Sequence, residues 1–364
     1  LRCDPRLLSE RAAAVPAPAA APAAAPTVEA PAGSPAACTP GAGSIAVLLP
    51  DSVSSPRWET DDRRYFDGAL KNAGVNYTIF NAQGDPDTQR QQAQQALADG
   101  AKVLVLVNLD SESGAAIIAD ARAAGAHVID YDRLTTAGPG ADIYISFDNL
   151  KVGTEMGQTL EPAINALGKE QPRIVQLNGS PTDNNATAVR AGYSGVATPY
   201  YDQGKWQLVA DQPVPDWDPQ QAGELFTQIL AGAGEGGVDA VFAGNDALAG
   251  AVVQVLQSQG REPVLLSGQD ATVAGVQNVL AGWQTMTVYK SFLNEASTAV
   301  IAALTFLNCE DVSTLRNNTV INNGVRDIPS ILLEPVAVTK DNVASTVIAD
   351  GFRTWDEICV DQYA

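Results

Sequence analysis

Short apolar segments alternate with helix-like segments along most of this chain. Residues 44–50 (Ser-Ile-Ala-Val-Leu-Leu-Pro) form an uninterrupted apolar run, which is typical of a strand buried in a parallel sheet. A helix over about residues 61–73 follows and is expected to end at Gly74, and a second strand is expected at 75–80. Because the alternation continues to about residue 307, it predicts an α/β protein whose parallel sheets carry helices on both faces.

The strand–helix units are too numerous for one small sheet. The pattern restarts after Asp148-Asn149, where a strand over 143–147 precedes a helix over 151–167. Since crossovers between parallel strands are right-handed, two doubly wound, Rossmann-like lobes are favoured. A final strand over 330–338 comes after the last helix and the turn at Asn322-Asn323-Gly324, which suggests that the chain crosses back between the lobes.

The charge of the chain excludes several classes of partner. The formal net charge of −20 over 364 residues argues against nucleic acid as a partner, because phosphate binding needs a basic face. The same acidity disfavours an anionic membrane surface or an anionic substrate, and its simplest role is solubility. No apolar run reaches the roughly 18 residues of a membrane-spanning helix.

The N-terminal segment and the cysteines indicate an exported protein. Residues 12–42 are almost entirely Ala and Pro, so residues 1–43 are expected to form a disordered leader or tether. Four cysteines in such a chain suit an oxidising compartment. We expect Cys309 to pair with Cys359, whereas Cys3 and Cys38 either pair or include a lipidated residue; four free thiols is the alternative. With one histidine and no Cys-x-x-Cys motif, a zinc site is not expected.

Polar side chains follow several predicted strands at the point where each strand ends. They are Asp132-Arg133, Asp148-Asn149, Asn245-Asp246, Gln269-Asp270 and Lys290. In open α/β sheets ligands lie outside the carboxyl ends of the strands, so carboxylates, amides and cations would converge there on a small neutral polyol. Each has a structural alternative: Asp132-Arg133 could be a surface ion pair, Lys290 a surface lysine, and Asp246 the more cap-like residue of its pair.

Two tryptophans and one Asp-Asn-Asn segment complete the candidate site. Arg57-Trp58 lies in the loop after the first strand, and Trp217 lies in a Pro-rich loop. Either indole could cover a sugar ring or simply anchor its own lobe. In Asp183-Asn184-Asn185 one residue is expected to cap the following helix, which leaves an amide free to face a cleft.

The residues that would support catalysis are missing. The sole histidine, His127, lies inside a predicted strand. The sequence has no Gly-x-Ser-x-Gly elbow, no phosphate-binding glycine loop and no EF-hand loop. Two carboxylates could serve a glycosidase, but equal numbers of amides and cations favour a binding protein. We therefore expect no enzymatic activity, no cofactor and no metal.

Six segments in uninterrupted order resemble one family. They are residues 131–133 (Tyr-Asp-Arg), 144–149 (Tyr-Ile-Ser-Phe-Asp-Asn), 179–186 (Gly-Ser-Pro-Thr-Asp-Asn-Asn-Ala), 244–247 (Gly-Asn-Asp-Ala), 268–271 (Gly-Gln-Asp-Ala) and 284–290 (Gln-Thr-Met-Thr-Val-Tyr-Lys). Over about residues 44–352 the chain resembles the D-xylose-binding proteins of bacterial ABC importers, which are type I periplasmic sugar-binding proteins.

The resemblance implies two lobes joined by a three-crossing hinge, with residues 44–148 and 289–325 in the first lobe and 149–288 and 326–364 in the second. It places Asp148 and Asn149 at the first crossing and Tyr289 at the second. It implies that sugar hydroxyls and the ring oxygen bind Arg57, Asp132, Arg133, Asn185, Asn245, Asp270 and Lys290, between the rings of Trp58 and Trp217. The loop at 51–56 is less charged than in the family. The Ala/Pro leader and the Cys309–Cys359 pair also depart from the family and suggest a tethered, cell-surface form.

The expected function is that of an extracytoplasmic, monomeric receptor that binds a monosaccharide, D-xylose above all, and delivers it to a membrane ABC permease. A sensor of the same fold, signalling to a histidine kinase or chemoreceptor, is the alternative. A transcription-repressor core would need a helix-turn-helix that residues 1–43 cannot form. A glycosidase or sugar isomerase would turn its sugar over.

Overall fold

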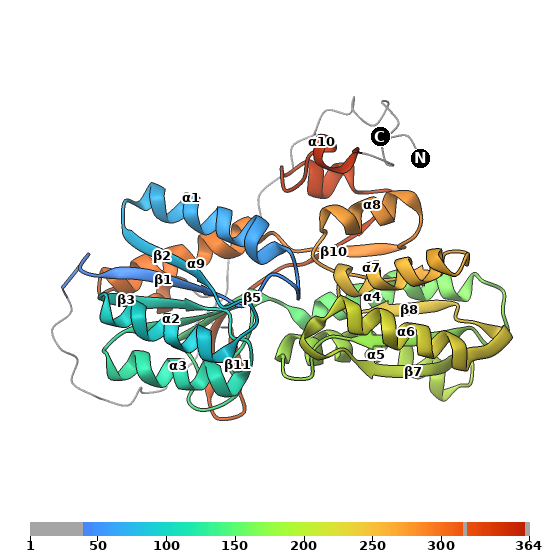
Figure 1. Ribbon diagram of the computed structural model, residues 1–364, viewed down its shortest axis with the longest axis horizontal. Coiled ribbons are helices and arrows are strands. Elements are labelled where there is room, and N and C mark those ends of the chain that lie inside the picture. Colours follow the sequence, from blue (N-terminus) through green and yellow to red (C-terminus); the bar gives the residue numbers. More distant parts are fainter. Residues whose placement is uncertain (1–38, 316–318, 361–364) are drawn as a thin grey trace, which may run out of the picture.

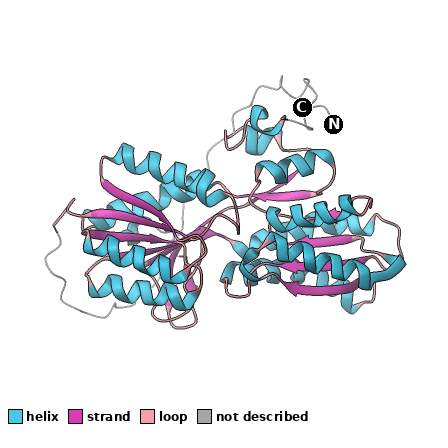
Figure 2. Ribbon diagram, in the orientation of Figure 1, coloured by secondary structure: helices cyan, strands magenta, loops and turns pink. Residues whose placement is uncertain are grey.

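The structure, a computed structural model, describes residues 39–315 and 319–360. These residues form two α/β lobes that lie side by side (Figure 1). Figure 2 shows helices on both faces of the main sheet in each lobe. The predicted class, an α/β protein with two doubly wound lobes, is confirmed.

The first lobe contains a seven-stranded sheet in the order β11-β12-β5-β4-β3-β1-β2. All neighbouring strands run parallel except β11 and β12, which form an antiparallel hairpin. Helices α1 and α9 pack on one face, whereas α2 and α3 pack on the other. In chain order these elements are β1 (Ser44–Leu49), α1 (Arg63–Ala73), β2 (Asn76–Asn81), α2 (Pro86–Ala98), β3 (Ala101–Leu106), α3 (Ser111–Ala123), β4 (His127–Tyr131), β5 (Ile143–Phe147), α9 (Phe292–Leu307), β11 (Val320–Asn322) and β12 (Asp327–Leu333).

The second lobe contains a four-stranded parallel sheet in the order β7-β6-β8-β9 and an antiparallel pair, β10 and β13. Helices α6 and α7 cover one face, and α4 and α5 pack together on the other. The elements are α4 (Asn149–Asn165), β6 (Arg173–Asn178), α5 (Asn184–Asp202), β7 (Gln207–Pro213), α6 (Pro219–Ala233), β8 (Ala240–Ala243), α7 (Asp246–Ser258), β9 (Leu265–Leu266), α8 (Val273–Ala281), β10 (Met286–Tyr289), β13 (Val336–Thr339) and α10 (Trp355–Ile358).

Local signals explain where individual helices begin and end. The side chain of Asp85 accepts a hydrogen bond from the backbone N–H of Asp87 and so caps α2, whose first residue is Pro86. Helix α1 ends at Gly74, which adopts a left-handed conformation with φ 68°. The end of α1 is the expected one.

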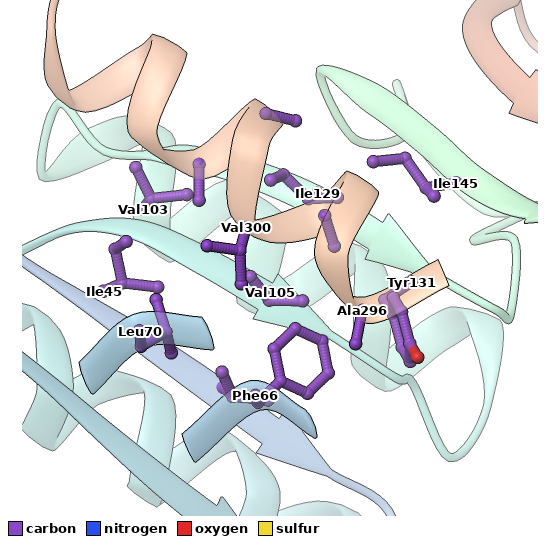
Figure 3. Packing of buried hydrophobic residues seen from close by; sticks show 14 of the residues in the cluster. Ile45, Phe66, Leu70, Val103, Val105, Ile129, Tyr131, Ile145, Ala296 and Val300 are labelled. Carbon is purple, nitrogen blue, oxygen red and sulfur yellow. The ribbon is translucent and has the colours of Figure 1, made fainter. Parts of the chain in front are cut away.

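The core of the first lobe explains the uninterrupted apolar run of β1. Ile45, Val47 and Leu49 face α1 and α9, while Ala46 and Leu48 face α2 and α3. Figure 3 shows the first of these cores, where side chains from α1 and α9 meet those of β1, β3, β4 and β5. Each fully buried aliphatic side chain contributes about 1.5–3 kcal/mol, so burial on both faces selects a continuous apolar strand.

The chain crosses between the lobes at three places. Asp148 lies at the first, between β5 and α4, and its side chain caps α4 through the N–H of Lys151. Tyr289 ends β10 before the second crossing into α9, and its hydroxyl is hydrogen-bonded to Asp350. The third crossing is the short connection between β12 and β13, where Glu334 forms an ion pair with Lys151 of the first crossing.

Two expectations for the C-terminal part are wrong. The run at 330–338 is two strands rather than one: β12 pairs with β5 in the first lobe, and β13 pairs with β10 in the second. Pro335 separates them, because proline has no N–H to continue a ladder. The predicted boundary between residues 325 and 326 is therefore misplaced, since the first lobe extends through β12 to Leu333.

Two of the four cysteines lie among the described residues. Cys309 and Cys359 are both disulfide-bonded. Cys309 follows the last turn of α9 in the first lobe, where the N–H of Gly41 donates to the carbonyl of Leu307. Cys359 ends α10, which packs on α8 of the second lobe. The predicted bond between these two residues stays a prediction. Cys3, Cys38 and most of the Ala/Pro leader lie outside the described residues.

Candidate functional site

A small cavity of about 30 Å³ lies where the carboxyl ends of the strands of the two lobes face each other. All nine residues predicted to contact a ligand line it: Arg57, Trp58, Asp132, Arg133, Asn185, Trp217, Asn245, Asp270 and Lys290. They come from loops spread over more than two hundred positions of the chain. Topology alone brings them together, as expected for ligands bound at strand ends.

Arg57 is the centre of the first-lobe half of this site. Its side chain is 1% exposed and donates to Asp62 from Nε (2.7 Å) and Nη2 (2.9 Å). It also donates to Asp132 from Nη1 (2.7 Å) and to Glu295 from Nη2 (2.7 Å). These bonds engage four of the five N–H groups of the guanidinium. Arg57 therefore fixes Asp132 and keeps at most one N–H for a ligand.

The pKa values of the three carboxyl groups around Arg57 are shifted in different directions. Burial alone would raise the pKa of Asp132, but Arg57, Lys290 and Arg133 together hold that pKa below its usual value. Burial raises the pKa of Glu295 well above its usual range despite Arg57, and it raises the pKa of Asp62 in the same way. Asp132, which lines the cavity, is thus the one carboxylate of the three for which the surrounding cations outweigh burial.

Helix N-termini build most of the second-lobe half. Asp183 caps α5 by accepting from the N–H of Asn185 at 2.9 Å, and its other oxygen accepts from Trp217 Nε1 at 3.0 Å. The Asn185 amide then donates across the cleft to the carbonyl oxygen of Asp132 at 2.9 Å and to its carboxylate at 3.1 Å. Arg133 Nε lies 3.2 Å from Asp183, so ion pairs and amides both span the lobes.

Asn245, rather than Asp246, caps α7. The side-chain oxygen of Asn245 (Oδ1) accepts from the backbone N–H of Leu248 at 2.9 Å. Its side-chain nitrogen (Nδ2) donates to the backbone carbonyl of Ser54 in the first lobe at 3.0 Å. Asp246 is buried behind it and accepts from Gln284 and Thr287, each at 2.8 Å. The expectation that Asp246 is the more cap-like residue is wrong. Helix α7 begins at Asp246, and the residue before it, Asn245, is the N-cap.

Both predicted indoles lie in the cavity wall. Trp58 is 2% exposed and donates from Nε1 to Ser54 Oγ at 3.1 Å. Trp217 lies across the ends of β6 and β8, where a Cβ on Gly179 would fall 2.1 Å from its ring and one on Gly244 2.9 Å from it. These two glycines are required by the close approach of the indole to the strand ends.

Lys290 and Asp270 form a buried pair between the lobes. Lys290 Nζ lies 2.9 Å from Asp270 Oδ1, and Ser55 Oγ donates to the other carboxylate oxygen at 3.1 Å. Burial would lower the pKa of Lys290, but Asp270 and Asp132 raise it overall. The ammonium is therefore charged and can donate to a ligand oxygen.

Several cavity residues were not predicted as ligand contacts. Ser54 and Ser55 come from the loop that is poorly charged for the family, and Asn149 was assigned to the hinge only. Gln269 was recognised as part of a polar strand end and Asp183 as a possible cap, but neither was assigned to the site. Asp62 and Glu295, two partners of Arg57, were not predicted either. Asp62 is only 5 positions from Arg57, whereas Glu295 is 238 positions away, where no local pattern links it to Arg57.

The described residues contain neither a candidate membrane-spanning helix nor a candidate metal site. Among residues 39–315 and 319–360, no helix is both long and apolar enough to cross a bilayer. Within the same ranges no three His, Cys, Asp or Glu side chains are grouped so that they could hold a metal ion.

Comparisons with known proteins place this arrangement in a family. A model of the periplasmic binding protein domain matches residues 45–310. The D-xylose-binding periplasmic protein of Escherichia coli is 37% identical over 85% of this chain and 90% of its own length. The multiple sugar-binding periplasmic receptor of Rhizobium radiobacter is 29% identical over 87% of this chain and 92% of its own.

Solved structures agree with the sequence matches. A solute-binding protein of an ABC transporter from Clostridium phytofermentans, with bound β-D-glucose, superposes with a TM-score of 0.80 at 28% identity. The match covers 86% of this chain and 99% of that protein. These relatives are binding proteins rather than enzymes. The chain therefore belongs to the periplasmic binding protein family, among its sugar-binding members.

Proposed function

We propose that this protein binds a monosaccharide, D-xylose in the first place, in the cavity between its lobes and delivers it to the permease of an ABC transporter. One observation carries the proposal. Buried donors and acceptors from both lobes converge with two indoles on one shared cavity. The same groups would surround every hydroxyl of a small sugar.

The balance of charge favours a neutral ligand. The cations Arg57, Arg133 and Lys290 are each paired with a carboxylate in the cavity wall, on Asp132, Asp183 and Asp270 respectively. An anionic substrate would meet these carboxylates, and a cationic one would meet the three cations. Sugar hydroxyls both donate and accept, so they can bind to paired charges and amides without leaving any buried group unpaired.

The relatives support a pentose. Proteins of Escherichia coli and Haemophilus influenzae that are named for D-xylose are 37% and 35% identical to this chain. Solute-binding proteins with bound glucose are similar at 27–28% identity, so hexoses are the competing ligands.

Binding would close the lobes about the three crossings, with Asp148, Asn149 and Tyr289 as hinge residues, and the permease would recognise the closed monomer. We place this outside the cytoplasmic membrane, where the disulfide bonds of Cys309 and Cys359 persist. A lipid or the N-terminal segment would hold the protein at the surface.

A thermal-shift screen against pentoses and hexoses tests the ligand. We expect the largest rise in unfolding temperature with D-xylose, because a ligand that binds only the folded state stabilises it by mass action. No shift with any monosaccharide would contradict the proposed function. A larger shift with D-glucose than with D-xylose would support sugar binding but contradict the preference for a pentose.

A sensor is the second candidate, because one relative is named a multiple sugar-binding receptor. Deletion of the gene separates the two roles. Loss of D-xylose uptake supports transport, whereas normal uptake with loss of a sugar-induced response supports sensing.

A further inference from the structure

Arg353 joins the two lobes at a point outside the ligand cavity. It lies in the C-terminal segment just before α10 and is 6% exposed. Its Nη1 and Nη2 donate to the two carboxylate oxygens of Asp61, each at 2.9 Å. Asp61 belongs to the short helix at Trp58–Asp62 in the first lobe and is 2% exposed. The pair is thus a buried, two-point ion pair, the geometry in which arginine binds carboxylates best.

The same guanidinium is held on the second lobe. Arg353 Nε donates to the carbonyl oxygen of Ala271 at 3.1 Å, and its backbone N–H donates to Val347. Helix α10, which begins two residues later, packs on α8. Arg353 therefore moves with the second lobe, while Asp61 moves with the first.

Both anchor points are next to cavity residues. Asp61 lies one turn after Trp58 in the same short helix, and Ala271 directly follows Asp270. The turn at Asp270 and Ala271 has φ values of 95° and 46°, in the left-handed region that non-glycine residues rarely adopt. Thr287 Oγ1 accepts from the N–H of Ala271, and Arg353 binds its carbonyl, so the strained turn is held from both sides.

Asp61 has a second cationic neighbour that does not link the lobes. Arg64 Nη2 lies 3.3 Å from Asp61 Oδ1, but Arg64 is on the same lobe and its side chain is 56% exposed. An exposed pair of this kind contributes little, and nothing that depends on closure. The two arginines on one carboxylate thus form a natural pair of test and control.

We propose that Arg353 and Asp61 form a clasp that is made when the lobes close, fixes the turn bearing Asp270, and slows the release of the bound sugar. The part that concerns release rests on the proposed sugar-binding function. Arg353 is a positioning residue, because it acts through Asp61 and Ala271 and does not line the cavity.

The test compares Arg353→Met, Asp61→Asn and the double variant with the control Arg64→Met, using D-xylose or the sugar of largest thermal shift. The dissociation constant and the dissociation rate constant are measured by stopped-flow tryptophan fluorescence, with the unfolding temperature of the sugar-free protein alongside. We expect each of the first two changes to raise the dissociation constant by about tenfold or more, mostly through faster dissociation. The double variant should lose no more than the worse single one, and Arg64→Met should stay within about twofold of the wild type.

A purely structural role for the pair would lower the unfolding temperature of the sugar-free protein and leave the dissociation rate unchanged, and that result overturns the proposal. Additive losses in the double variant overturn it as well. Should Arg353→Met not fold, Arg353→Lys retains the charge without the two-point geometry, and an unchanged dissociation rate in that variant is equally contradictory.

The clasp can be tested even if the wild type binds no sugar, an outcome that would refute the proposed function alone. Spin labels on exposed sites of the two lobes give the interlobe distance distribution of the sugar-free protein. We expect Arg353→Met to shift it towards longer distances and Arg64→Met to leave it unchanged. Identical distributions in the wild type and Arg353→Met would overturn the clasp.

Discussion

The two halves of the ligand cavity are built in different ways. In the first lobe, Arg57 forms buried ion pairs with the nearby Asp62 and with Asp132 and Glu295, which lie 75 and 238 positions away in the chain. In the second lobe, Asp183 and Asn245 are fixed by capping helices α5 and α7, through bonds that span two or three residues. One half depends on long-range charge pairing, and the other on local hydrogen bonds at helix N-termini.

The difference has a consequence for how each half tolerates change. A buried ion pair that loses one partner leaves an uncompensated charge, which costs about 3–5 kcal/mol. A cap that is lost exposes one backbone N–H and costs about 0.5–2 kcal/mol. Substitutions in the first-lobe half should therefore destabilise the protein more. Substitutions in the second-lobe half should be better tolerated, so that this half is more easily adapted to another sugar.

The largest effect is expected for Arg57→Met. Without the guanidinium, three buried carboxylates lose their shared cation, so the free energy of unfolding should fall by about 3–5 kcal/mol. Urea unfolding measures it. The control is Arg63→Met, because Arg63 forms a half-exposed pair with Glu59 and should cost below about 1 kcal/mol. Equal losses of unfolding free energy in the two variants would show that Arg57 stabilises the protein no more than Arg63 does.

The next effect concerns a second-lobe carboxyl group that has no cation. Burial raises the pKa of Asp246 to about 7, so the folded state binds more protons than the unfolded state between about pH 4 and pH 7. Its contribution to the free energy of unfolding must then fall as pH rises through that window, by at most about 1.4 kcal/mol per pH unit. Asp132, whose pKa is lowered by its cations, contributes with the opposite sign.

Asp246→Asn tests this sign. The variant cannot titrate here, so its stability relative to the wild type should rise by at least about 1 kcal/mol between about pH 4.5 and about pH 7.5. Urea unfolding at the two pH values measures the difference. A constant difference would show that Asp246 is already ionised in the folded protein.

A moderate effect is expected for Asp183→Ala. The change removes the cap of α5 and the acceptor of Trp217 Nε1, so stability should fall by about 1–2 kcal/mol. Sugar affinity should fall as well, because Arg133 loses its partner. Thermal unfolding and calorimetry measure the two. Asp183→Asn, which keeps a capping oxygen, should restore most of the stability, and an equal loss in both variants would argue against the cap.

The smallest effect is expected for Asn245→Ser. Serine caps a helix about as well as asparagine, so the cap of α7 is retained, while the bond from the Asn245 amide to Ser54 is lost. Stability should change by only a few tenths of a kcal/mol, and sugar binding should weaken by about 0.5–1.5 kcal/mol. A large loss of stability would place Asn245 among the structural residues instead.

The same contrast explains how far the sequence could predict the site. Strand ends and helix starts have local sequence signals. The site residues of the second lobe and the alternation of strands and helices could therefore be predicted from short stretches of sequence. Glu295 could not, because it lies 238 positions from Arg57 and nothing near either residue indicates that the two will pair. The run at 330–338 was misread because its apolar pattern continues across Pro335, and only pairing assigns its halves to two lobes. The pairing of the cysteines stays a prediction, because a count of cysteines contains no distances.

Titration calorimetry of D-xylose with the wild type, Arg133→Ala and Asp270→Ala tests the central claim most directly, since the two residues come from opposite halves of the cavity. We expect one sugar per chain for the wild type and a loss of at least about 2 kcal/mol in binding free energy for each variant, because each leaves buried groups unpaired. Near-unchanged affinity in either variant would contradict a site formed jointly by both lobes.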